Sequence, residues 1–202
     1  MATQPGLRER KKQRTRETIS RAAHRLFAER GYHATTLPDI AEAADVSTRT
    51  IFAYFPSKED ILFSDFPLMK DALGQALAER PQGEEALDTL RAFILSAVQV
   101  EKSEVDERLG ECIAGDEILR SHLRAKFAQL EEVITPAIAE DLGAPPDDLR
   151  PQLVAASLTA AFNLLYERDA GKKAKPRTAD ELATLLDPVF GFLRGGLDAL
   201  RR

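Results

Sequence analysis

Apolar residues recur at helical spacing along nearly the whole chain, and this periodicity constrains the fold more than any other feature. Ile19, Ala23 and Leu26, for example, share one face of a helix that ends at Gly31. No segment shows the sustained alternation of apolar and polar residues that marks a strand. The sequence therefore predicts an all-α protein, with later helices at about residues 57–79, 84–102, 105–114, 117–142, 147–168 and 179–201. Pro136 and Pro188 lie inside two of these segments, and each is expected to kink or split its helix.

Several classes of function are disfavoured by what the sequence lacks. Cys112 is the only cysteine among 202 residues, which excludes a disulfide framework and argues against a thiolate metal cluster. The three histidines are scattered, and the phosphate-binding, dinucleotide-binding and zinc-protease motifs are missing. We therefore expect no enzyme, no cofactor and no metal site. The N-terminus is basic without the apolar region of a signal peptide, and the longest uncharged stretch, residues 151–166, is too short to span a bilayer. We therefore expect a cytoplasmic protein that does not enter a membrane.

The charge is distributed very unevenly along the chain. The formal net charge is −5, yet residues 1–30 hold nine Lys or Arg against three Glu, which makes +6 and leaves −11 for the rest. A basic end on an acidic body is typical of a protein that binds phosphate groups of nucleic acid. The alternative is a solvated basic tail, and residues 1–13 are predicted to be a mobile arm.

Residues 36–55 have the pattern of a helix-turn-helix. Two short helices are predicted, at about 35–44 and 48–54, and the positions that pack them together are Ile40, Ala41, Ala44, Val46 and Ile51. Thr36 is expected to cap the first helix, Ser47 or Thr48 the second, and Ser57 the next. The turn residue Asp45 is expected to tolerate a positive φ. A pair of ordinary packed helices without a DNA-binding role is the alternative.

The second of these helices would present Thr48, Arg49, Phe52 and Ala53 on its exposed face. Arg49 has the fork geometry that pairs with guanine in the major groove. Lys58 stands at the start of the following helix, where a phosphate is readily bound. Contacts to the DNA backbone are also expected from three hydroxyl side chains, Thr35, Thr36 and Tyr54.

Residues 15–62 resemble the TetR family of bacterial repressors. The resemblance rests on Ile19, Ala23, Leu26, Phe27, Gly31, Tyr32, Thr35, Thr36, Ile40, Ala41, Val46, Ser47, Thr50, Ile51, Tyr54, Phe55, Ser57, Lys58, Glu59 and Leu62. It implies nine or ten helices: a three-helix DNA-binding domain within residues 1–60, and a ligand-binding and dimerisation domain within residues 61–202. The DNA-facing positions that it implies are Thr36, Ser47, Thr48, Arg49, Thr50, Phe52, Tyr54 and Lys58. Asp45 stands where the family usually has Gly in the turn, which is expected to cost a little stability. Phe52 stands where a Tyr is common, so a phosphate hydrogen bond at that position is expected to be lost.

The rest of the chain is expected to sense an unidentified small molecule. The residues selected as candidates for lining its site are Phe66, Met69, Phe93, Leu109, Cys112, Phe127, Ser157 and Asn163. For the apolar ones a filled core is the alternative, for Cys112 also a redox sensor, and for Ser157 and Asn163 a hydrogen bond at a dimer interface. Residues 48–60 resemble those of a TetR subgroup that includes the mycofactocin-system regulator, which implies ligands like acyl-CoA.

Small residues in the last two helices, such as Ala156, Ala160 and Gly195, would let two subunits pack as a four-helix bundle. A homodimer places two recognition helices in successive major grooves of double-stranded operator DNA. The expected mechanism is repression at a palindromic operator, released by a small, largely apolar ligand through the helix predicted at 57–79. The alternative is a ligand-independent activator or architectural protein with the same DNA-binding end and a filled bundle.

Overall fold

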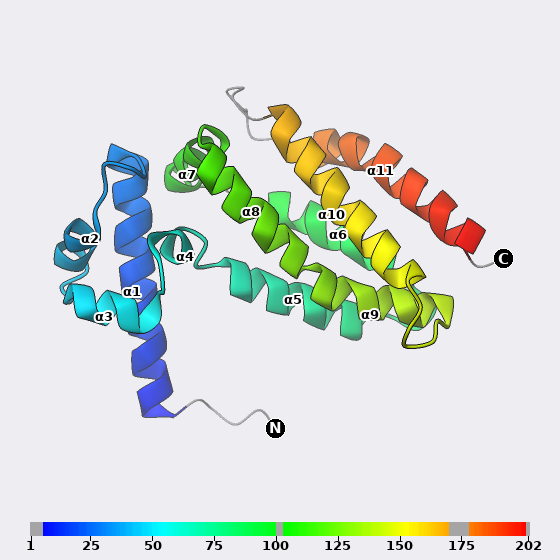
Figure 1. The fold of residues 1–202 in the computed structure, drawn as a ribbon, viewed down its shortest axis with the longest axis horizontal. Coiled ribbons are helices and arrows are strands. Elements are labelled where there is room, and N and C mark those ends of the chain that lie inside the picture. The colour runs from blue at the N-terminus through cyan, green and yellow to red at the C-terminus, as the bar shows by residue number, and fades with distance from the viewer. Residues whose placement is uncertain (1–5, 100–102, 170–177, 201–202) are drawn as a thin grey trace. The chain divides into compact units, whose positions relative to one another are not determined.

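A computed structural model describes residues 6–99, 103–169 and 178–200 (Figure 1). Within these residues the regular structure is entirely helical, with eleven helices and no strand, which confirms the predicted fold class. The chain divides into two compact units, one of residues 1–64 and 102–113 and one of residues 65–101 and 114–202. The functional boundary predicted at residue 60 stays a prediction. None of the described helices is long and apolar enough to cross a membrane.

The first unit is built around one long helix. It contains α1 (Leu7–Arg30), α2 (Leu37–Ala43), α3 (Thr48–Tyr54), α4 (Lys58–Leu62) and most of α7 (Glu104–Ala114). Helices α2 and α4 pack on α1, and α3 packs on α2 (Figure 1). The side chains of Ile19, Phe27, Ile40, Ile51 and Phe55 are at most 1% exposed. These residues form the core that fixes the three short helices on α1.

The ends of the short helices match the sequence predictions. Thr36 and Asp39 form a reciprocal capping box at the start of α2, and Ser47 and Ser57 accept hydrogen bonds from backbone N–H groups at the starts of α3 and α4. Gly31 ends α1 with φ of 86°, and Asp45 has φ of 52° in the turn between α2 and α3. Side-chain caps and left-handed turn residues therefore define where these helices begin and end.

The second unit is a bundle of six helices: α5 (Phe66–Ala78), α6 (Ala86–Gln99), α8 (Glu117–Gln129), α9 (Glu131–Leu142), α10 (Arg150–Asp169) and α11 (Ala179–Leu200). Helix α10 packs against α8 and α9 and also against α11 (Figure 1). Helix α6 packs against α5, α9 and α11. Leu119, Ile134, Leu158 and Phe190 are at most 1% exposed and lie in the core of this bundle.

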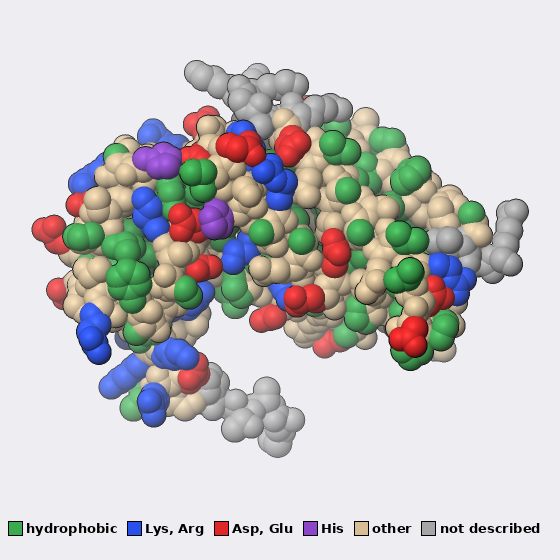
Figure 2. Space-filling model, in the orientation of Figure 1, with side chains coloured by type: hydrophobic (Ala, Val, Ile, Leu, Met, Phe, Trp, Pro, Cys, Tyr) green, Lys and Arg blue, Asp and Glu red, His purple; other side chains and the backbone are tan. Residues whose placement is uncertain are grey.

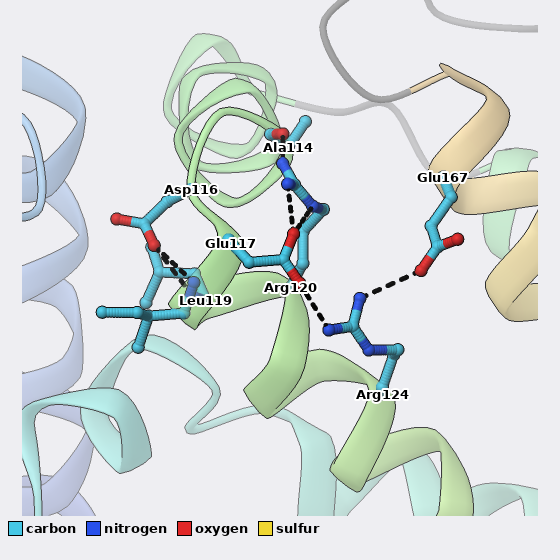
Figure 3. Close-up of polar contacts among 8 residues, drawn as sticks. Ala114, Asp116, Glu117, Leu119, Arg120, Arg124 and Glu167 are labelled. Atoms are coloured by element: carbon cyan, nitrogen blue, oxygen red, sulfur yellow. Dashed lines mark hydrogen bonds and ion pairs between the residues drawn. The ribbon is translucent and has the colours of Figure 1, made fainter.

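An ion-pair network ties α8 to α10 within this unit (Figure 3). Glu117 accepts hydrogen bonds from both Arg120 and Arg124, and Arg124 also reaches Glu167 on α10 at 3.0 Å. The hydrogen bonds from Arg124 and Arg120 hold the pKa of the Glu117 carboxyl below its usual value. Arg120 also donates to the carbonyl oxygen of Ala114, so the network covers the start of α8.

Two of the nine helices predicted from the periodicity are each divided in the structure, so the described residues contain eleven helices, one more than the upper number implied by the resemblance. The segment 57–79 is interrupted at residues 63–65, because Pro67 lies in the first turn of α5 and favours a new helix start there. The segment 117–142 breaks at Leu130 rather than at Pro136, and both α9 and α11 continue through their prolines.

The prediction of a mobile arm is wrong for residues 7–13, which are the first turns of α1. Residues 1–5 of that predicted arm lie outside the described part of the chain. The periodicity missed these helical turns because they carry no apolar stripe to bury.

Candidate nucleic-acid interface

Helix α3 has one face in the core and one on the surface. Ile51 is buried, and Phe55 is buried directly after the helix. On the other side, Thr48, Arg49, Phe52 and Ala53 line an open depression in the surface. Phe52 is 56% exposed, which is unusual for so large an apolar side chain. The four residues selected from the sequence for this face therefore do lie together on it.

The carboxyl end of α3 is held by Arg16 of α1. Nη1 of Arg16 donates to the carbonyl oxygen of Tyr54 at 3.0 Å. The guanidinium carbon lies 4.3 Å from the centre of the Phe55 ring, in the geometry of a cation–π contact. Arg16 thus helps to hold α3 in position. From the sequence it was counted only among the basic residues of the chain end.

Lys58 also makes internal contacts that its sequence position did not suggest. Its Nζ donates to the carbonyl oxygens of Tyr32 at 2.9 Å and Thr35 at 3.0 Å, and it lies 4.0 Å from the centre of the Tyr32 ring. The Tyr32 hydroxyl in turn donates to Glu59. Lys58 therefore fastens the connection between α1 and α2 to α4, and one of its three N–H groups is left for another acceptor.

Four of the hydroxyl side chains selected for DNA contact fall into two groups. Thr36, Ser47 and Thr50 are exposed or half-buried, and their hydroxyls take part in the caps of α2 and α3. Thr35 is 1% exposed, and its hydroxyl donates to the carbonyl oxygens of Gly31 and Leu26. The side chain of Thr35 therefore lies in the core and does not face the surface on which DNA contacts were predicted.

Asp39 completes the cap of α2 through hydrogen bonds with Thr36. Its carboxylate accepts from both the hydroxyl and the backbone N–H of Thr36, at 2.6 and 2.8 Å. These hydrogen bonds lower the pKa of the Asp39 carboxyl from its ordinary value, with a smaller contribution from the charge of Arg30. The start of α2 is consequently held by an ionised carboxylate at neutral pH.

His24 is a further residue that the sequence analysis did not select for this region. Its Nε2 lies 3.0 and 3.1 Å from the carbonyl oxygens of Ile61 and Leu62, at the end of α4. Because both partners are acceptors, Nε2 carries the hydrogen. His24 thus satisfies two backbone carbonyls where α4 ends.

The candidate ligand-lining residues are divided between the two units. Leu109 and Cys112 lie on α7, which groups with the first unit, and the other six lie in the second. Of these six, Phe66 is buried and Ser157 is exposed, and the rest, Met69, Phe93, Phe127 and Asn163, are half-buried. The Ser157 hydroxyl donates back to the carbonyl of Leu153. The structure therefore does not define one site that contains all eight residues.

Comparisons with known proteins agree over most of the chain. Residues 19–64 match the family model for bacterial regulatory proteins of the tetR family, and residues 84–198 match that for the MftR C-terminal domain. The HTH-type transcriptional regulator TcmR of Streptomyces glaucescens is 34% identical over 168 residues, which cover 77% of this chain and 73% of TcmR. A Mycobacterium tuberculosis protein named MftR, for mycofactocin biosynthesis regulation, is 28% identical over 96% of both chains.

A solved structure agrees over a similar length. Thermus thermophilus FadR, a TetR-family repressor in complex with lauroyl-CoA, superimposes with a TM-score of 0.60. The two sequences are 27% identical, and the alignment covers 90% of this chain and 94% of that one.

Proposed function

Because the chain belongs to the TetR family of DNA-binding transcriptional regulators, we propose that it is a homodimeric repressor released from a palindromic operator by a small, largely apolar ligand. The observation that carries the DNA-binding part is the outer face of α3, where Arg49 and Phe52 are exposed on a helix held from behind by Arg16. A side chain that reads base edges must be exposed on a rigidly held helix.

The proposed DNA-contacting set follows from this placement. Arg49 and Thr48 are the base-reading candidates near the start of α3. The remaining contacts are proposed to be to phosphates, which fix the register of the protein, and come from Thr36, Ser47, Thr50, Tyr54 and Lys58. Phe52 has no polar atom, so we propose an apolar contact, for instance with a thymine methyl group.

Selection of random duplexes by the purified protein tests the proposed function. An enriched inverted repeat, bound with the stoichiometry of a dimer, is the expected result. Salt-sensitive binding without an enriched sequence would instead favour an architectural DNA-binding protein. A failure to bind any duplex would contradict the assignment of α3 as a recognition helix.

We propose that dimerisation uses the outer faces of α10 and α11. Leu153 and Leu164 on α10 are 59% and 68% exposed, and Phe192 on α11 is 74% exposed. Small residues on these helices, among them Ala156 and Gly195, are also exposed and would permit close approach of a second copy. Phe192→Glu should convert a dimer to a monomer in analytical ultracentrifugation, whereas Ile118→Glu, an exposed apolar position on α8, should leave the dimer intact.

We propose an acyl-CoA-like effector for the second unit, in line with the lauroyl-CoA complex of the Thermus thermophilus relative. Half-buried aromatic side chains support an apolar ligand: Phe127 of α8 and Phe162 of α10 have ring centres 6.4 Å apart. Burial raises the pKa of the neighbouring Tyr166 to about 12, so its phenol stays neutral. Ser157, exposed on the outer face of α10, is assigned to the dimer interface instead.

The effector proposal is tested with lauroyl-CoA, and with lauric acid and free coenzyme A as matched controls. A ligand that binds only the folded second unit increases the free energy of unfolding, by about 2.7 kcal/mol at a ligand concentration a hundred times the Kd. The melting temperature rises as a result. The ligand also weakens operator binding only if it binds the DNA-incompetent state more tightly. If lauroyl-CoA changed neither the melting temperature nor operator affinity, this class of effector would be wrong.

A further inference from the structure

The first two turns of α1, residues 7–14, form a projecting basic segment. All eight residues are exposed, and five of them are cations, namely Arg8, Arg10, Lys11, Lys12 and Arg14. Figure 2 shows Lys and Arg side chains gathered at this end of α1, with an acidic side chain among them. The continuous core contact of α1 begins only at Ile19, so this segment stands clear of the packed part of its unit.

This segment is electrostatically unfavourable when the protein is alone. Arg8 and Lys12, and likewise Arg10 and Arg14, are like charges four residues apart, which repel each other on a helix. Arg8 and Arg10 in the first turn also oppose the positive end of the helix dipole, and the one acidic residue there, Glu9, offsets only part of this charge. Within the described part of the chain, none of the five cations makes an ion pair. A polyanion alongside the segment would relieve both unfavourable terms.

The cations lie on two different sides of α1. At 100° per residue, Arg8 and Lys12 are in line with Arg16, and farther along with Ile19 and Ala23. Those two apolar residues are fully buried, and Arg16 touches the end of α3, so this side of α1 is the one that carries the short helices. Arg8 and Lys12 therefore lie on the same side of α1 as Arg16, which contacts the carboxyl end of α3. Figure 1 shows that this end of α1 extends past α3.

Arg10 and Arg14 lie on the opposite side. Their side of the helix continues through Glu17, Arg21 and Arg25, all of which are exposed. These two cations therefore face solvent, away from α3. Both pairs carry two positive charges four residues apart on α1. They differ in the side of the helix from which their side chains project.

We infer that Arg8 and Lys12 form a second DNA-binding surface, which binds two backbone phosphates flanking the base pairs read by α3. The inference rests on the proposed operator binding and adds to it a contact outside the helix-turn-helix. The partner is double-stranded DNA, because the same rigid helix that carries the two cations also holds the recognition helix. Phosphate contacts of this kind add affinity and salt dependence without adding sequence information.

The test compares Arg8→Gln/Lys12→Gln with Arg10→Gln/Arg14→Gln in the full-length protein, using the operator selected by the wild type. Operator affinity is measured by fluorescence anisotropy between about 50 and 200 mM salt. For the first variant we expect the slope of log affinity against log salt to fall by about 1.8. With equal affinities at 1 M salt, this corresponds to roughly a 60-fold loss at 0.1 M salt. The second variant should change the slope by less than half as much, and both should enrich the same operator as the wild type.

Several results would overturn the inference. An unchanged slope in Arg8→Gln/Lys12→Gln, or equal changes in the two variants, would show that the segment contributes no directed contact. An altered sequence preference in Arg8→Gln/Lys12→Gln would show that these residues act through α3 rather than on phosphates. A wild type that binds no duplex would overturn the proposed function as well, whereas the other results leave it standing. All the substituted residues are exposed and removing them relieves like-charge repulsion, so the variants are expected to unfold at the wild-type urea concentration or slightly above it.

Discussion

Replacing Arg16 by Met tests whether α3 is positioned from behind by a guanidinium group. The substitution keeps an unbranched apolar stem and removes the group that donates to the Tyr54 carbonyl and lies over the Phe55 ring. A charged hydrogen bond contributes roughly 1.5–3 kcal/mol, and a cation–π contact roughly 0.5–2 kcal/mol. Arg16 is half-buried and water can replace it at the carbonyl, so values near the low ends apply. We expect a loss of about 2 kcal/mol in the free energy of unfolding.

The assay is urea denaturation followed by circular dichroism, with the change in midpoint multiplied by a common slope. Arg21→Met is the matched control, since Arg21 is an exposed cation on the same helix whose side chain makes no hydrogen bond or ion pair with the described residues. The control should change the free energy of unfolding by less than about 0.5 kcal/mol. Equal losses in the two variants would refute the assignment of a positioning role to Arg16.

DNA binding gives a second, independent readout for the same pair. Arg16→Met frees the carboxyl end of α3, so, if α3 reads the operator as proposed, discrimination between the operator and a scrambled duplex should decrease. The salt dependence should change little, because Arg16 is engaged inside the protein and not on a phosphate. A fall of the salt slope by about one, with discrimination intact, would mean that Arg16 is a phosphate contact instead.

Three further predictions concern the same unit. Arg49→Ala should weaken operator binding by about 1–3 kcal/mol and relax selectivity at one base pair, as measured by competition with single-base variants; uniform weakening across sequences would make Arg49 a phosphate contact. Lys58→Met should lower the free energy of unfolding by about 1–2 kcal/mol, because two carbonyls of the α1–α2 connection lose their donor; unchanged unfolding in urea would contradict this. Because the pKa of Asp39 is lowered in the folded state, its contribution to stability is present above its unfolded pKa and disappears as pH falls through its folded pKa. The stability difference between wild type and Thr36→Val should therefore shrink on acidification in urea titrations, and a constant difference would contradict that assignment.

Local signals in the sequence were sufficient to predict much of the helix-turn-helix. The bounds of α3, the caps at Thr36, Ser47 and Ser57, and the positive φ of Asp45 all depend on residues within a few positions of one another. Hydrogen bonds between a side chain and a nearby backbone group are encoded by residue type and spacing alone. These predictions are confirmed for that reason.

Contacts between distant residues were not predictable in the same way. Arg16 meets Tyr54 across 38 positions and Lys58 meets Tyr32 across 26, and no periodicity signals such a pairing. The same limit explains why Thr35 was selected as a surface hydroxyl, since its burial depends on how the end of α1 folds over it. A basic residue near a DNA-binding helix can therefore have a structural role. Only the folded structure distinguishes such a residue from one that is available to contact DNA.

The shortness of α2, α3 and α4 has a consequence for how the first unit opens. These helices have seven, seven and five residues, far fewer than the roughly 12–15 that an isolated helix needs to be even marginally stable in water. None can persist once it leaves α1, so their backbone amides should exchange with solvent through one shared opening event. Native-state hydrogen exchange should then report a single free energy for all three helices, and operator DNA should raise that free energy for the set as a whole. DNA binding and the local folding of this unit would then be thermodynamically coupled.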